Sequence, residues 1–461
     1  MKKHLQFIFF FFISVKLLSQ DGSLDNTFNA TNVGIDGLVL GITVQPDNKI
    51  LVSGRFNFYN NISTNNIVRL NSDGNLDSSF NPSSGSDQQI HTSAVQPDGK
   101  ILIGGYFSKF NGVSMNRIAR LNVDGSLDTS FNPGNGANDI INSIIVLPDG
   151  KILIAGYFTT YNGISRNRIA RLNTDGSLDA SFNYVTGANS NIEDIVLQTD
   201  GKILIAGDFS TFNNITARSI ARLNYDGTLD TNFLGNGSST ISSIALQKDG
   251  KIIIGGYFTT YNGTSINRIA RLNSNGTLDT SFNTGNGANG TVYCVIPQPD
   301  GKILVGGDFT TYNSSSLGSL IRLNTNGSLD SSFNVGTGTN SNILDIALQA
   351  DNKILIGGGF TTFNSIEKNK LARLNNTPNL DIRDYTEKNV FSYPNPVTDI
   401  LYIENAINSR AYIYNLAGDL IKIFDVENNK SNVNLGSLKE GNYILVLDDG
   451  ENRKTIKIIK K

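Results

Sequence analysis

The stretch that decides the fold runs from residue 140 to residue 182 and reads IINSIIVLPDGKILIAGYFTTYNGISRNRIARLNTDGSLDASF. An apolar run, Ile140–Val146, is followed by Pro148-Asp149-Gly150 and by a second run, Lys151–Ile154. Proline, aspartate and glycine in this order suit a type I turn that is closed by a residue in the left-handed conformation. The stretch therefore predicts two antiparallel strands joined by a tight turn.

The second half of the stretch predicts two further strands. Residues 169–173 form a third strand, and the Asp175-Gly176 turn leads into a fourth. If this turn has the same geometry, Arg171 lies opposite Asp179 and can pair with it across the strands. Such a pair would fix the strand register more than it adds stability. The same spacing predicts the pairs Arg69–Asp77, Arg120–Asp128, Arg222–Asp230, Arg271–Asp279 and Arg322–Asp330.

The unit is repeated seven times. The lysine after the first turn recurs at steps of 51 residues, with one step of 49, and an Arg-Leu-Asn phrase follows each lysine twenty residues later. In the first and seventh units Asn48 and Asn352 replace the turn glycine, and asparagine is the next residue to tolerate a left-handed backbone. The lysines are Lys49, Lys100, Lys151, Lys202, Lys251, Lys302 and Lys353.

Seven units of four short strands predict an all-β fold, a seven-bladed β-propeller. An open solenoid would use the same strands, so the order of the repeated phrases along the sequence has to distinguish a solenoid from a closed ring. A Leu-Asp-x-x-Phe phrase at residues 24–28 precedes the first lysine unit, whereas the last unit lacks a good copy. A ring closed by its N-terminal segment needs this offset. Asp25 is then the expected partner of Arg373, with Asp381 as the alternative.

Composition excludes several classes of function. Lys plus Arg number 38 against 40 Asp plus Glu, so no basic field exists to attract nucleic acid. One cysteine, Cys294, excludes an internal disulfide framework and a cysteine-rich zinc site. Two histidines in the whole chain leave few groups for general acid–base catalysis.

The two ends of the chain differ from the repeats. Residues 1–19 combine an early pair of lysines with a short apolar run, which is typical of a secretory signal peptide. We assign residues 20–375 to the propeller and the polar residues 376–389 to a linker. Residues 390–461 alternate apolar and polar positions and predict a small C-terminal β-sandwich.

Both assignments are supported by resemblance. The Asp-Gly-Lys-Ile-Leu, Arg-Leu-Asn and Leu-Asp-x-x-Phe phrases resemble the delta-60 repeats of secreted bacterial proteins, a family that implies a propeller and no defined reaction. Residues 390–461 resemble the C-terminal sorting domain of the type IX secretion system of Bacteroidetes, through Tyr393-Pro394-Asn395-Pro396, the turn at residues 415–418 and the basic end. The resemblance implies recognition by that machinery and secretion or surface attachment, often with removal of the tail.

Positions that vary along the repeated frame are candidates for ligand contact. In a propeller the first strand of each blade lines the central channel. One position there carries polar or aromatic residues in several units, and tyrosines recur in the loop after the second strand. The candidate ligand-facing residues are His91, Glu193 and Tyr293 in the strands and Tyr59, Tyr161, Tyr261 and Tyr312 in the loops. Packing of the ring explains the same positions without a ligand.

Three functions fit these residues. The first is a non-enzymatic scaffold or recognition protein, monomeric, that binds a glycan or protein through blade loops. The second is an extracellular carbohydrate-active hydrolase or lyase that uses Glu193, Asp194 and Asp345 and needs two acids within about 10 Å. The third is a calcium-stabilised adhesin with calcium at the Asp-Gly turns, although the distal ligands of a calcium loop are missing. No other cofactor is expected.

Overall fold

The structure is a computed structural model that describes residues 20–29, 33–182, 186–233, 235–376, 391–404, 406, 409–415, 420–426, 428, 430–448 and 453–461. The predicted signal peptide, residues 1–19, lies outside the described residues. The chain divides into two compact units, Met1–Pro378 and Asn379–Lys461. The division falls within the predicted linker. Among the described residues no helix is long and apolar enough to cross a membrane.

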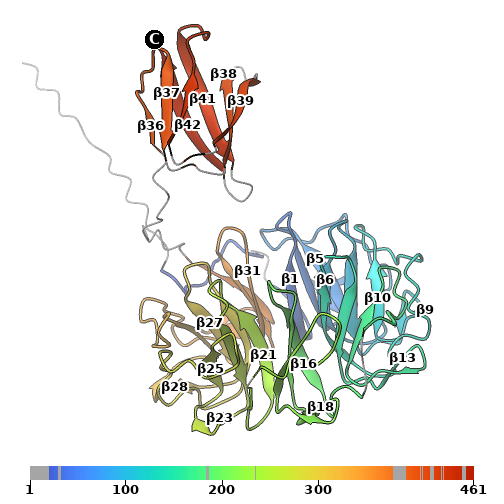
Figure 1. Ribbon diagram of the computed structural model, residues 1–461. Helices are drawn as coiled ribbons and strands as arrows, with labels where there is room; N and C mark the ends of the chain where they lie inside the picture. Colours follow the sequence, from blue (N-terminus) through green and yellow to red (C-terminus); the bar gives the residue numbers. More distant parts are fainter. Residues whose placement is uncertain are drawn as a thin grey trace, which may run out of the picture. The chain divides into compact units, whose positions relative to one another are not determined.

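The first unit is a ring of seven blades, as predicted (Figure 1). Each blade is a three-stranded antiparallel sheet whose first strand is innermost and packs against the first strands of the two neighbouring blades. The innermost strands are β1 (Leu38–Val44), β6 (Ile90–Val95), β11 (Ile141–Val146), β16 (Ile192–Leu197), β21 (Ile241–Leu246), β26 (Val292–Pro297) and β31 (Ile343–Leu348).

The second strand of each blade is almost entirely buried, because it lies between two strands and between two blades. In β12 every residue is buried. Gly150 in the preceding turn has a φ of 80°, and Asn48 and Asn352 have φ values of 65°, which confirms the predicted turn. The second strands are β2 (Ile50–Arg55), β7 (Ile101–Gly105), β12 (Ile152–Gly156), β17 (Ile203–Gly207), β22 (Ile252–Gly256), β27 (Ile303–Gly307) and β32 (Ile354–Gly358).

The third strand confirms the predicted register, but the fourth is shorter than predicted. Leu172 pairs with Leu178 in a single bridge, and the chain then turns because Ser181 donates from its backbone N–H and hydroxyl to Asp179. Each blade thus has three strands and one bridge. The third strands are β5 (Ile67–Leu70), β10 (Ile118–Leu121), β15 (Ile169–Leu172), β20 (Ile220–Leu223), β25 (Ile269–Leu272), β30 (Leu320–Leu323) and β35 (Leu371–Leu374).

Each blade also carries a small two-stranded hairpin between its second and third strands, where we expected only a polar loop. The hairpins are β3 (Phe58–Tyr59) with β4 (Ile62–Ser63), β8 (Lys109–Phe110) with β9 (Val113–Ser114), β13 (Thr160–Tyr161) with β14 (Ile164–Ser165), β18 (Thr211–Phe212) with β19 (Ile215–Thr216), β23 (Thr260–Tyr261) with β24 (Thr264–Ser265), β28 (Thr311–Tyr312) with β29 (Ser315–Ser316), and β33 (Thr362–Phe363) with β34 (Ile366–Glu367).

The predicted Arg–Asp pairs are present in every blade. Arg171 Nε lies 2.7 Å from Asp179 Oδ2, and Lys151 Nζ lies 2.8 Å from the same oxygen. The arginine also stacks on Phe182 and donates through Nη1 to the backbone carbonyl of Tyr225 in the next blade. This arginine therefore fixes the register within its own blade and joins that blade to the next.

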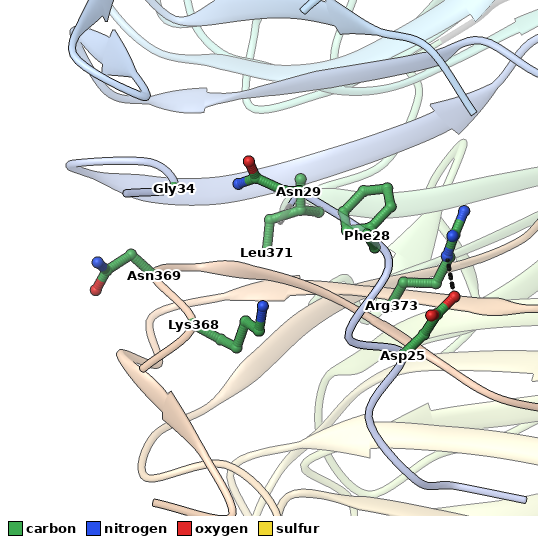
Figure 2. A pocket seen from close by; sticks show the side chains of 8 residues that line it. All are labelled: Asp25, Phe28, Asn29, Gly34, Lys368, Asn369, Leu371 and Arg373. Carbon is green, nitrogen blue, oxygen red and sulfur yellow. Dashed lines mark hydrogen bonds and ion pairs between the residues drawn. The ribbon is translucent and has the colours of Figure 1, made fainter. Parts of the chain in front are cut away.

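The N-terminal segment completes the seventh blade, as predicted. Leu24 bridges Leu374, and Arg373 Nε lies 2.8 Å from Asp25 Oδ2. Figure 2 shows this junction, where Asp25 and Phe28 of the first segment lie beside Arg373. The pair therefore forms with Asp25, whereas Asp381 lies outside the described residues.

The second unit consists of two sheets that enclose one core, in agreement with the predicted sandwich. Leu401, Ile413 and Leu445 are fully buried in that core. One sheet contains β36 (Phe391–Tyr393), β37 (Ile400–Glu404) and β40 (Lys430–Asn434). The other contains β39 (Leu420–Val426), β38 (Ser409–Asn415), β41 (Gly441–Asp448) and β42 (Arg453–Lys460).

Candidate functional site

A β-bulge near the start of each innermost strand positions the candidate site. In β16 the register shifts between Ile192 and Asp194, so Glu193 is an extra residue without a partner in β17. A bulge redirects the side chain of the extra residue. The bulged residues of the seven blades are Leu40, His91, Asn142, Glu193, Ser242, Tyr293 and Leu344.

Four side chains of blades two to four form one continuous set of hydrogen bonds, which we call the axial polar chain. His91 Nδ1 lies 3.2 Å from Asn142 Oδ1, and Asn142 Nδ2 donates to Glu193 Oε2 at 2.8 Å. The Tyr157 hydroxyl donates to Glu193 Oε1 at 3.0 Å. All four residues are partly exposed. The structure thus brings two predicted residues, His91 and Glu193, into one site.

The hydrogen bonds of the axial polar chain determine the tautomer of His91. Because the amide oxygen of Asn142 can only accept, His91 donates from Nδ1 and keeps an acceptor at Nε2, which is buried and has no hydrogen-bond partner within the described residues. Burial lowers the pKa of His91 although the bond to Asn142 opposes this effect. The imidazole of His91 in the axial polar chain is therefore neutral.

Burial also raises the pKa of Glu193, against the hydrogen bond from Tyr157, and the charge of Asp208 raises it further. Burial and Glu193 together raise the pKa of Tyr157 to about 12. The donors of the axial polar chain are used within the structure, so its remaining capacity lies in the further lone pairs of the Glu193 carboxyl oxygens, which can orient the hydroxyl donors of a polar ligand.

Asp194 and Asp345, proposed above as catalytic acids, instead join neighbouring blades. Asp194 Oδ2 accepts from the backbone N–H of Ile244 at 2.9 Å, and Asp345 Oδ2 accepts from that of Ile42 at 2.6 Å. Burial raises the pKa of Asp194 to about 6 and that of Asp345 to about 7, despite these backbone bonds. Their carboxyl oxygens accept from backbone N–H groups, and Asp194 Oδ1 also accepts from the Ser143 hydroxyl at 3.3 Å.

The prediction that Tyr161, Tyr261 and Tyr312 face a ligand is wrong, and the same holds for Tyr59. All four side chains are fully buried. The Tyr161 hydroxyl donates to the carbonyl of Gly176 at 2.7 Å, so the tyrosine anchors the Asp-Gly turn of its own blade. The corresponding acceptors are Gly74 for Tyr59, Gly276 for Tyr261 and Gly327 for Tyr312.

Three tyrosines occupy one repeated position of the blades, and one of them, Tyr157, belongs to the axial polar chain. Tyr106, Tyr157 and Tyr257 each follow the last glycine of a second strand, and their backbone N–H groups bond to the segment that enters the innermost strand. Tyr106 is 37% exposed and Tyr257 is 56% exposed. Sequence reasoning missed this position, although it is the variable residue of the repeated Gly-x-Phe phrase. The predicted Tyr293 is partly exposed, and burial and Asp308 raise its pKa.

The oxygens at the Asp-Gly turns already have protein donors. Asp175 Oδ1 accepts from the backbone N–H and hydroxyl of Ser177. Asp179 Oδ2 forms ion pairs with the ammonium group of Lys151 and the guanidinium group of Arg171. Two cations on one oxygen would repel a calcium ion. Within the described residues, no group of three or more His, Cys, Asp or Glu side chains is placed to hold a metal.

Comparison with protein families identifies both units. The model described as "Domain of unknown function (DUF5122) beta-propeller" matches seven segments, and the model of the secretion system C-terminal sorting domain matches residues 392–461. The seven segments are residues 45–80, 96–131, 147–182, 198–233, 247–282, 298–333 and 349–381. No curated protein matches the chain significantly.

Solved structures with similar folds have low sequence identity. PorZ of Porphyromonas gingivalis, described as a surface component of the type IX secretion system, is 15% identical with a TM-score of 0.42, and the match covers 96% of this chain and 60% of PorZ. The propeller domain of Doa1 is 16% identical with a TM-score of 0.49, and the match covers 78% of this chain and 97% of the Doa1 domain. The extracellular domain of BT4673 from B. thetaiotaomicron is 13% identical with a TM-score of 0.46, and the match covers 96% of this chain and 59% of that domain. The chain thus spans about 60% of two of these three proteins.

Proposed function

Because this chain belongs to the DUF5122 beta-propeller family, we propose that it is a non-enzymatic recognition protein that binds an extracellular glycan at the axial polar chain. The sorting domain indicates export to the cell surface or secretion and engagement with the type IX secretion machinery. We assign that engagement to residues 390–461 and the recognition of a ligand to the ring.

The axial polar chain is the observation that carries the proposal. Along a frame that repeats seven times, blades two to four differ from the rest at the bulge and place an imidazole, an amide and a carboxylate in hydrogen-bond contact. Blade two also carries the exposed ring of Tyr106, on which Arg117 stacks, and hydrogen-bonding side chains combined with an aromatic ring suit a sugar.

The hydrogen-bond partners of the acidic residues near the axis support binding without catalysis. Glu193 bonds to Asn142 and Tyr157, whereas Asp194 and Asp345 accept backbone N–H groups of neighbouring blades. A hydrolytic pair needs two carboxyl groups that flank a substrate bond. The carboxylates near the axis have partners that match a structural or binding role.

A glycan array with the full mature chain tests the proposal. We expect Glu193→Gln and His91→Ala to reduce binding of the selected glycan at least tenfold. The matched control is Val123→Ala, which removes an exposed side chain at an Asp-Gly turn and should leave binding unchanged. Equal binding by all three variants would contradict the site, and release of reducing sugar by the wild type would contradict the non-enzymatic assignment.

A further inference from the structure

Two positions that lie eleven residues apart vary together among the seven blades. Blades two, three and five pair a tyrosine with an arginine, as Tyr106–Arg117, Tyr157–Arg168 and Tyr257–Arg268. Blades four and six pair an aspartate with a serine, as Asp208–Ser219 and Asp308–Ser319. The cation is therefore missing where the tyrosine is replaced by a carboxylate.

The arginine and lysine copies show what this place in a blade binds. Arg117 Nη1 donates to the carbonyls of Tyr106 at 2.9 Å and Phe107 at 3.1 Å. In blade three Arg168 Nη1 donates to the carbonyl of Tyr157. In blade seven Lys370 Nζ donates to the carbonyl of Gly359 at 2.8 Å. Three blades thus place a cation against the backbone carbonyl that follows the second strand.

Blade six lacks this cation and has a groove there instead. The groove has a volume of about 480 Å³ and lies between the blade-six residues Asp308, Phe309 and 316–319 and the loop at residues 337–342. Gly318 also widens the groove because it has no side chain. The equivalent residue of blade two, Asn116, donates from its side chain to the carbonyl of Asn135 at 3.0 Å. A side chain cannot be added at Gly318 without a shift, since its Cβ would lie 2.9 Å from Gly338 Cα.

The groove combines acceptors with one negative charge. Among its lining residues Asp308 is the only charged one, and its side chain is exposed. Leu317 supplies partly exposed apolar surface for the methylene groups of a long side chain, whereas the Phe309 side chain is fully buried beneath the groove. The volume lies within the range of ligand sites in proteins, roughly 300–1,000 Å³.

We propose that this groove binds an arginine or lysine side chain of a partner polypeptide, which takes the place that Arg117, Arg168 and Lys370 fill in their own blades. The cation donates to the carbonyl of Asp308 and pairs with the carboxylate of the same residue. This inference does not rest on glycan binding at the axial polar chain, and its ligand is a peptide rather than a sugar.

The test uses the full mature chain and a bead-displayed pentapeptide library with randomised flanks. The central residue is arginine, lysine, citrulline or leucine, so that citrulline keeps the shape of arginine without its charge. We expect labelled protein to bind arginine and lysine beads at least tenfold more strongly than citrulline or leucine beads. Equal binding to arginine and citrulline beads would overturn the proposal.

Two variants locate the binding. Ser319→Arg copies the arginine of blades two, three and five and should abolish selective binding, whereas Ser219→Arg adds the same charge in blade four and should preserve it. If Ser319→Arg lowers the melting temperature markedly, Asp308→Asn provides the second measurement, with an expected loss of at least fivefold. Selective binding that survives in a folded Ser319→Arg or in Asp308→Asn, or that is lost equally in Ser219→Arg, would overturn the site.

Discussion

Asp25 Oδ2 accepts hydrogen bonds from Arg373 Nε at 2.8 Å and from Lys353 Nζ, although 348 residues separate Asp25 from Arg373. Arg373 also donates through Nη1 to the carbonyl of Ser72 in the first blade. The N-terminal segment, the last blade and the first blade therefore meet at one carboxylate. Burial alone would raise the pKa of Asp25, but Lys353, Thr27 and Arg373 hold it well below its usual range.

Asp25→Ala should destabilise the ring by about 3–5 kcal/mol, because removing one partner leaves the buried guanidinium of Arg373 without its counter-charge. Asp25 is 4% exposed and Arg373 is 6% exposed. Chemical denaturation followed by circular dichroism measures the loss. Asp98→Ala, at an exposed turn, is the control and should cost less than about 1 kcal/mol. Equal losses for the two variants would mean that the closure is not held by this pair.

Stability should decrease as pH rises from 5 to 8. The folded pKa values of Asp194 and Asp345 are about 6 and about 7, above the ordinary aspartate value of 3.8. A raised folded pKa contributes stability that is complete below the unfolded pKa and is lost as pH rises through the folded value. The melting temperature at constant ionic strength measures the effect, and Asp345→Asn should flatten the profile. A profile that is unchanged in Asp345→Asn would exclude this origin.

Below pH 4 the opposite trend is expected. The folded pKa of Asp230 is about 2, because hydrogen bonds from Lys202, Asn232 and Arg222 outweigh the effect of burial. A lowered folded pKa contributes stability that is present above the unfolded value and is lost as pH falls through the folded one. The seven copies of this aspartate should therefore make the ring unfold cooperatively between about pH 4 and pH 2. Retention of the native melting temperature at pH 2 would contradict this expectation.

The blade could be predicted from sequence because its determinants are local. The Pro-Asp-Gly turn and the Asp-Gly turn fix the register within a few residues, so Arg171 had to lie opposite Asp179. Because the sequence unit is repeated, the strand register inferred for one blade applied to all seven. The fourth strand was overestimated because Ser181 turns the chain at Asp179, and this side-chain bond competes with strand pairing.

The candidate site was less predictable for physical reasons. The bulge lengthens the spacing of the buried residues Ile192 and Ile195 from two to three, but this spacing does not tell which of the two residues between them is the extra one, so the redirection of Glu193 was not foreseen. The buried state of Tyr161 was missed because its acceptor, the Gly176 carbonyl, lies in a turn fifteen residues later. The sequence did indicate His91 and Glu193, because they occupy a position that varies from blade to blade while the surrounding frame repeats.

The buried tyrosines give the last prediction, which separates a structural role from a ligand-facing one. Tyr161→Phe should lower the free energy of unfolding by about 1–2 kcal/mol, because the carbonyl of Gly176 loses its buried donor while the ring still fills its site. Tyr161→Ala should cost more, about 3–5 kcal/mol by analogy with other buried aromatic residues, because it also leaves a cavity. Tyr257→Phe is the matched control, since its side chain is 56% exposed and its stability should change by less than about 0.5 kcal/mol. Denaturant titration and glycan binding are measured on the same preparations. A folded Tyr161→Phe protein that has lost binding without losing stability would restore this tyrosine to the ligand site.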